Sequence, residues 1–210
     1  MEKRQIVVGW AEKDITPDRP VFLVGQFHPR ISQYVDGPLT ATALVIGTDN
    51  DYAVMVSCDC AVLNMGIRER CRDAIKQKKS NIDGKKVILN ATHTHSAPGT
   101  DKRRFSHEPE GLMTISEYAD FFVDKIADVV CEAWDSRKTS GLSWGYGHAV
   151  VGRNRRVSYF DDISKRSGYK KISGLISHGT SVMYGSTEDP NFSHIEGYED
   201  HGVDMLFTWD

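Results

Sequence analysis

Apolar residues follow two kinds of spacing along the chain, which predict strands and helices in turn. Short apolar runs predict strands over 6–9, 41–47, 52–58, 87–90 and 205–209. Apolar residues three or four apart predict one helix over 66–78 and a longer one after the capping-box sequence Thr114-Ile115-Ser116-Glu117. The strand–helix–strand order over 52–90 predicts a right-handed parallel crossover. The expected fold class is therefore α/β, a mixed sheet with parallel crossover units and flanking helices.

The later half of the chain has a weaker pattern. Residues 142–150 alternate between apolar and polar, as in a half-exposed strand, whereas 161–200 are polar and rich in Gly and Ser and predict a long surface excursion. We expect a single domain over 1–210, truncated relative to a larger one. Later residues would normally cover the last strand, so we expect an exposed apolar patch near Phe207 and Trp209 and self-association through it.

Composition limits the classes of function. The chain has 210 residues, is 40% hydrophobic and carries a net charge of -3, which is typical of a globular protein and gives no sign of nucleic-acid binding. Apolar runs stay well below the roughly 18 residues of a membrane helix, so no integral membrane segment is expected. The charged residues 1–5 lead into only three apolar ones, too few for a signal peptide. The chain as written is predicted to be cytoplasmic, or secreted or periplasmic if a signal was removed.

The strongest candidate for chemistry is the segment Asn90–Gly99, which follows the predicted strand over 87–90. Side chains of an extended segment alternate between faces, so His93 and His95 are expected to point the same way. Two imidazoles on one face at the end of a strand can supply half of a zinc site. The alternative is a pair of ordinary polar loop residues, one of them hydrogen-bonded in the core.

Two weaker candidates end the neighbouring predicted strand. Asp59 follows 52–58, and sites in α/β sheets gather beyond the carboxyl ends of parallel strands. It is interpreted as a metal ligand, as the acceptor of the second ring N–H of a metal-bound histidine, or as a plain turn residue. Cys58 and Cys60 share a predicted strand face and could bind metal, although small buried thiols are more common.

Five segments resemble the neutral, non-lysosomal ceramidase family and its broad bacterial relatives. The most specific is Ala91–Gly99, close to the family signature T-H-T-H-S-G-P-G with Ala97 in place of a glycine. Gly9–Pro17 is similar to the family's opening G-x-A-x-x-D-I-T-P, and Asp36–Ile46 to the segment before its next strand. Val56–Asp59 is similar to a strand ending in aspartate, and Asn154–Arg156 to a later N-R element.

The resemblance implies the fold of the family's N-terminal region and a zinc hydrolase that releases a fatty acid from a sphingoid base by amide cleavage. It implies that His93 is a zinc ligand, that His95 supports the active centre and that Arg155 contacts the substrate. Zinc would polarise the carbonyl and lower the pKa of a bound nucleophile. The expected partner is a small-molecule or lipid-like substrate.

The family's remaining ligands and its nucleophile come from later positions that this sequence does not match. The chain is therefore interpreted as the N-terminal part of a larger enzyme, with activity alone left open, or as a short relative that recruits another residue. Conceivable recruits are His148, His178, His194 and His201. Two other function classes stay open. One is an unrelated metal-dependent hydrolase, and the other is a non-catalytic ligand-binding or assembly module that keeps the fold.

Basic residues near the predicted site suggest a different substrate from ceramide. Lys102-Arg103-Arg104 follow the histidine segment, and Arg153, Arg155 and Arg156 follow the strand over 142–150. Arginine forks favour carboxylate, sulfate or phosphate groups. If these loops converge, an acidic sugar or another anionic N-acylated molecule is expected; the alternative is that they are solvated loop charges.

Overall fold

The computed structural model describes residues 5–26, 28–48, 50–101, 110–168 and 177–209. The chain divides into two compact units, which are described separately: Met1–Leu142 with Thr208–Asp210, and Ser143–Phe207. That residues 1–210 form one domain stays a prediction. The predicted basic segment over 102–104 lies outside the described residues.

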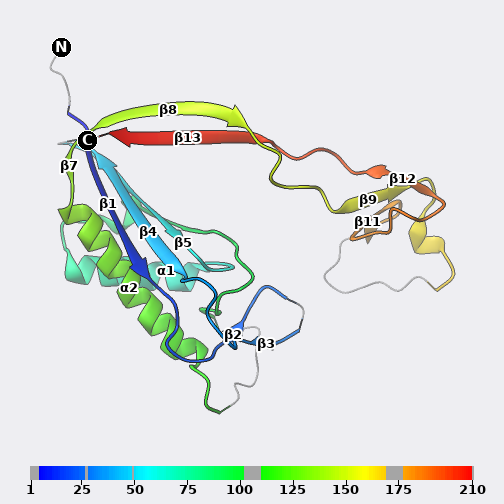
Figure 1. Ribbon diagram of the computed structural model, residues 1–210, viewed down its shortest axis with the longest axis horizontal. Helices are drawn as coiled ribbons and strands as arrows, with labels where there is room; N and C mark the ends of the chain where they lie inside the picture. The colour runs from blue at the N-terminus through cyan, green and yellow to red at the C-terminus, as the bar shows by residue number, and fades with distance from the viewer. Residues whose placement is uncertain (1–4, 27, 49, 102–109, 169–176, 210) are drawn as a thin grey trace. The chain divides into compact units, whose positions relative to one another are not determined.

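The first unit is built on a mixed sheet with the strand order β6-β5-β4-β1-β7 (Figure 1). The strands are β1 (Val7–Asp14), β4 (Thr40–Gly47), β5 (Tyr52–Cys58), β6 (Val87–Ala91) and β7 (Lys138–Thr139). β4 pairs antiparallel with β1 and β5, whereas β5 and β6 are parallel, as the strand–helix–strand order predicted. β1 extends beyond the predicted range 6–9, because Glu12, Lys13 and Asp14 also pair with β4.

Two helices complete the core of this unit. α1 (Met65–Lys78) begins after Asn64, whose side chain accepts a hydrogen bond from the backbone N–H of Ile67. α2 (Ile115–Asp135) begins with the predicted capping box between Thr114 and Glu117. The alternating buried residues of β4 and β5 join the apolar faces of both helices in one core. The helices therefore cover one face of the sheet, and the fold is the mixed α/β class that the sequence predicted.

A short hairpin lies beside this sheet and matters for the site. β2 (Phe22–Leu23) pairs antiparallel with β3 (Arg30–Ile31), and Leu23 forms an isolated antiparallel bridge with Pro98. A one-turn 3₁₀ helix, η1 (Gly84–Lys86), leads into β6. The hairpin thus contacts the segment that follows β6.

The second unit contains a small sheet with the order β10-β11-β9-β12. These strands are β9 (Arg156–Tyr159), β10 (Ser177–His178), β11 (Ser181–Met183) and β12 (Phe192–Ile195), with a 3₁₀ helix, η3 (Ile163–Lys165). The sequence predicted an irregular excursion over 161–200, but strands of two to four residues are too short to leave a readable alternation.

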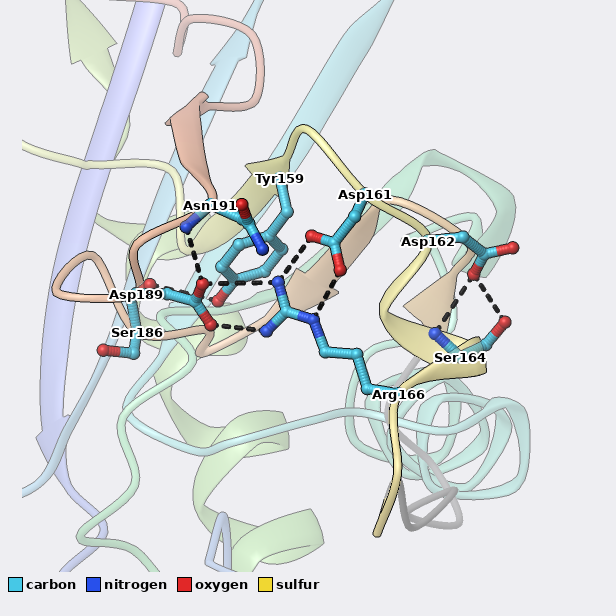
Figure 2. A network of polar contacts seen from close by, with 8 residues as sticks. All are labelled: Tyr159, Asp161, Asp162, Ser164, Arg166, Ser186, Asp189 and Asn191. Carbon is cyan, nitrogen blue, oxygen red and sulfur yellow. Dashed lines mark hydrogen bonds and ion pairs between the residues drawn. The ribbon is translucent and has the colours of Figure 1, made fainter.

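The hydrophobic core of this unit is small, and a network of charged groups forms around Arg166 (Figure 2). The Arg166 guanidinium pairs with Asp161 and Asp189, and lies 5.1 Å from the ring centroid of Tyr159. Hydrogen bonds from Arg166 hold the pKa of both carboxyls below their usual value, and the carboxyls raise that of Arg166. Because Asp161 and Arg166 follow β9 whereas Asp189 precedes β12, their pairing links these two stretches of the chain.

β8 (Gly141–His148) and β13 (Gly202–Trp209) form a two-stranded ribbon whose strands run in opposite directions in Figure 1. Phe207 and Trp209 are 43% and 57% exposed, which agrees with the predicted exposed apolar residues, whereas self-association stays a prediction. Within the described residues, no helix combines the length and apolar character needed to cross a membrane.

We predict that Thr114→Ala lowers the free energy of unfolding by about 1 kcal/mol, because it removes the side chain that caps the Glu117 N–H. Urea unfolding followed by circular dichroism measures the change. Ser116→Ala, at an exposed position in the same turn, is the matched control. Equal stability of the two variants would contradict a working capping box.

Candidate functional site

The candidate site lies where the parallel strands β5 and β6 end. Their pairing brings Cys58 opposite Ala91, so the residues that follow run side by side. The backbone N–H of Thr92 donates to the Cys58 carbonyl and that of His93 to the Cys60 carbonyl, both at 3.0 Å. The histidine segment is therefore held by the loop after β5, as expected for a site at the carboxyl edge of a sheet.

His93 is fixed by its own ring and by an unusual backbone. Its Nδ1 lies 2.6 Å from the carbonyl oxygen of Ala61. A carbonyl only accepts, so Nδ1 carries the proton, and in the neutral ring Nε2 is an acceptor that faces the Nε2 of His95. The φ angle of His93 is 63°, a left-handed conformation that costs energy for a residue with a side chain.

His95 completes a pair of facing imidazoles. Its Nε2 lies 3.2 Å from the Nε2 of His93, with ring centroids 4.8 Å apart and ring planes at 77°. The sequence predicted from strand alternation that the two rings would point the same way. β6 in fact ends at Ala91, and the left-handed turn at His93 brings the rings together.

The pair faces a cavity of about 620 Å³. Its lining includes both histidines, Asn64, Asp101 and Gly25. Asn64 caps α1 through Oδ1 and donates through Nδ2 to Asp101 at 3.0 Å, so this wall is fixed by hydrogen bonds. A preformed cavity with a few converging polar groups has the character of a binding site.

The Asp59 carboxylate is hydrogen-bonded to threonines and not to a histidine ring. One carboxylate oxygen accepts hydrogen bonds from the backbone N–H and hydroxyl of Thr40, at 2.9 and 3.1 Å, and the other accepts from the Thr92 hydroxyl at 3.0 Å. The ring N–H of His93 goes to Ala61 and not to this carboxylate. Asp59 thus ties together the ends of β4 and β6, and a role as metal ligand stays a prediction.

The cysteines near the site are buried thiols. Cys58 and Cys60 have no disulfide, and burial raises the pKa of both, that of Cys60 to about 12. Thiolates, not thiols, bind metals, so these environments oppose metal binding.

The predicted substrate-contacting arginine belongs to the second unit. Arg155 is exposed, donates to the Tyr184 hydroxyl at 2.7 Å and lies 5.1 Å from that ring's centroid. Neighbouring Arg156 pairs with Glu196, which reduces the cationic character of this stretch. Contact between Arg155 and a substrate stays a prediction.

The histidine pair fits two ligand positions of a zinc ion. With Zn–N bonds of about 2.0–2.1 Å and a tetrahedral angle, two ligand nitrogens lie roughly 3.3 Å apart, and the Nε2 atoms are 3.2 Å apart. The fit is partial, because the described residues contain no cluster of three His, Cys, Asp or Glu side chains. The proposed recruits His148, His178, His194 and His201 all belong to the second unit.

Two residues that the sequence did not single out contact His95. The Arg30 guanidinium donates to its carbonyl, and the Gly25 backbone lies against its ring. Both come from the β2–β3 hairpin, about 65–70 positions earlier in the chain, and a single glycine or arginine gives no local signal of such a contact.

The fold is similar to that of neutral ceramidase from Pseudomonas aeruginosa, with a TM-score of 0.58 and 22% sequence identity. A structure described as ceramidase complexed with C2 gives the same values. In both comparisons 75% of this chain is covered, and it spans a quarter of the other chain. No family model and no curated protein sequence matches the chain. The ceramidase-like fold that the sequence motifs implied is thus confirmed.

We predict that Asp59→Ala lowers the free energy of unfolding by about 1–3 kcal/mol, because the Thr40 N–H and the two threonine hydroxyls lose their acceptor. Chemical denaturation measures the loss. Asp36→Ala removes an exposed carboxylate from a loop and should leave stability nearly unchanged. A similar small effect for both variants would count against the structural role of Asp59.

Proposed function

We propose that this chain forms the N-terminal part of a zinc-dependent, ceramidase-like hydrolase that cleaves an amide, or N-acyl, bond. The observation that carries the proposal is the pair of Nε2 atoms 3.2 Å apart at the edge of a preformed cavity. The ceramidase-like fold supports the same class of reaction. The remaining ligands and the nucleophile would come from residues outside this pair.

The roles of the chain's own residues follow from their contacts. The Ala61 carbonyl accepts the Nδ1 proton of His93, so Nε2 would be the nitrogen that binds a zinc ion. His95 would supply the second ring nitrogen beside it. When bound, zinc supplies a Lewis acid that polarises the amide carbonyl and lowers the pKa of water.

The proposed substrate is an N-acylated molecule, either lipid-like, as the name ceramidase indicates for the similar structures, or carrying an acidic group. The cavity beside the histidines is large enough for an amide and its flanking atoms. Arg155 would bind the anion of an acidic substrate, since its guanidinium is solvent-exposed beside Tyr184.

We predict that the purified chain binds about one zinc ion and that His93→Ala loses it, because a lone imidazole binds zinc weakly. Competition with a chromophoric chelator measures the affinity, and elemental analysis measures the stoichiometry. Release of fatty acid from an N-acyl sphingoid substrate, assayed with added zinc, tests the reaction.

His148→Ala is the matched control, because this histidine is exposed and contacts Tyr146 in the β8–β13 ribbon. It should bind zinc as the unchanged chain does. Full zinc affinity retained in His93→Ala would refute a site at the pair, whereas loss of affinity in His148→Ala would identify that histidine as a recruited ligand. Zinc binding without hydrolysis would restrict the chain to part of a site, and absence of both would favour a ligand-binding module.

We predict that Arg155→Glu reduces turnover of a carboxylate-bearing N-acyl substrate about tenfold or more while sparing a neutral one, since the variant replaces a cation with an anion. Steady-state kinetics on the paired substrates measures the difference. Lys165→Glu, the same reversal of charge at another exposed position of the second unit, controls for a general change of charge. Unchanged turnover of the anionic substrate would eliminate the anionic-substrate proposal.

A further inference from the structure

The β2–β3 hairpin makes four contacts with the histidine segment. Leu23 bridges Pro98, and the backbone N–H of Val24 donates to the Ala97 carbonyl at 3.0 Å. Arg30 reaches the carbonyl of His95, and Gly25 lies against its ring. The segment after β6 is thus held on one side by the loop after β5 and on the other by this hairpin.

Gly25 meets the His95 imidazole at a distance that no side chain allows. A Cβ built on Gly25 would lie 2.4 Å from Cγ of His95 and 2.8 Å from Cδ2. Its φ angle of 102° also falls in the region that glycine adopts readily. The backbone of Gly25 therefore forms a wall behind the ring, and any larger residue would have to displace the imidazole.

Arg30 acts on the same residue through the main chain. Its Nη2 donates a charge-assisted hydrogen bond to the His95 carbonyl, and its Nε is buried without a partner among the described residues. The Nε of this guanidinium is out of contact with water, and the bond from Nη2 to the carbonyl restrains His95. His95 lies outside any regular element, and such external contacts must fix it.

We propose that the β2–β3 hairpin is the positioning element of the histidine pair, with Gly25 and Arg30 holding the His95 ring against His93 before any ligand arrives. The left-handed backbone of His93 is disfavoured by itself, and it persists only where the surroundings impose it. The inference rests on the proposed function in one respect: the pair that the hairpin preorganises would serve as two zinc ligands. Gly25 and Arg30 act on the ring and the carbonyl of His95 and not on a substrate, so both are positioning residues.

The first test is Gly25→Ala in the metal-free chain. Nuclear Overhauser effects between the ring protons of His93 and His95 report their contact directly, and we expect them in the unchanged protein and not in the variant. Zinc affinity should fall about 10- to 100-fold, the range typical for loss of a group that orients a metal ligand. Thermal unfolding checks that the variant is folded.

Two other glycines separate the possible causes. Gly37→Ala adds a Cβ in the same loop region with nothing within 4 Å and no positive φ, so it should change nothing. Gly111→Ala adds a Cβ at a φ of 84°, again with no neighbour within 4 Å, and measures backbone strain alone. Inter-ring contacts and zinc affinity should survive in both.

Arg30→Met is the second variant and decides the question if Gly25→Ala does not fold. It should weaken the inter-ring contacts and zinc binding, and Arg30→Lys should restore part of both by returning a cationic donor. Arg19→Met, which removes an arginine that pairs with Glu117, is the control.

Retained inter-ring contacts and unchanged affinity in both Gly25→Ala and Arg30→Met would overturn the proposal, as would absence of the contacts in the unchanged chain. An unchanged chain that has the contacts but binds no zinc would refute the zinc site and leave the positioning role intact. The retention or loss of the inter-ring contacts in the variants then shows whether the hairpin positions the rings or only stabilises the fold.

Discussion

The parallel pairing of β5 with β6 is the constraint on which the rest of the site depends. Parallel strands end at the same edge, so the loop after Cys58 and the loop after Ala91 leave the sheet together. Four contacts join these loops: two backbone hydrogen bonds from Thr92 and His93, the bond from the His93 ring to Ala61, and the bond from the Thr92 hydroxyl to Asp59. An antiparallel neighbour would place these loops at opposite edges. The crossover through α1 is therefore what makes the histidine pair possible.

Polar side chains at this edge convert a strand end into a fixed platform. Asp59 accepts three hydrogen bonds from Thr40 and Thr92, which links β4 to the segment after β6. Asn64 starts α1 and also holds Asp101 in the cavity wall. The cost of the left-handed turn at His93 is met by the bonds made by its own N–H and ring. Rigid surroundings and a strained residue thus occur together, as they often do at binding sites.

Much of the first unit could be predicted from sequence because its strands and helices are long enough for apolar residues to recur at a regular spacing. The alternation in 41–47 and 52–58, the helical spacing after residue 66 and the Thr114–Glu117 capping box all correspond to observed elements. That His93 and His95 point the same way was expected from strand alternation, but their close contact depends on a left-handed turn at His93, which periodicity does not reveal.

Other features depend on contacts that no local pattern encodes. Gly25 and Arg30 meet His95 across about 65–70 residues, and Arg166 joins two carboxylates from different segments of a unit whose strands are very short. Asp59 follows a predicted strand, where a ligand was expected, but its partners are Thr40 at the start of β4 and Thr92 just after β6, which only the pairing of the strands reveals.

Fold and chemistry support the hydrolase proposal in different ways. A TM-score of 0.58 at 22% identity means that the arrangement of strands and helices is shared while most side chains differ. A sheet of this kind can support many reactions, so the shared fold indicates only where a site would lie. The chemical content comes from the few side chains at that edge: two imidazoles with converging nitrogens, one of them fixed in its tautomer by a carbonyl. The proposed reaction therefore depends on how the His95 ring is held, and the hairpin that touches it is as much part of the site as the strand that precedes it.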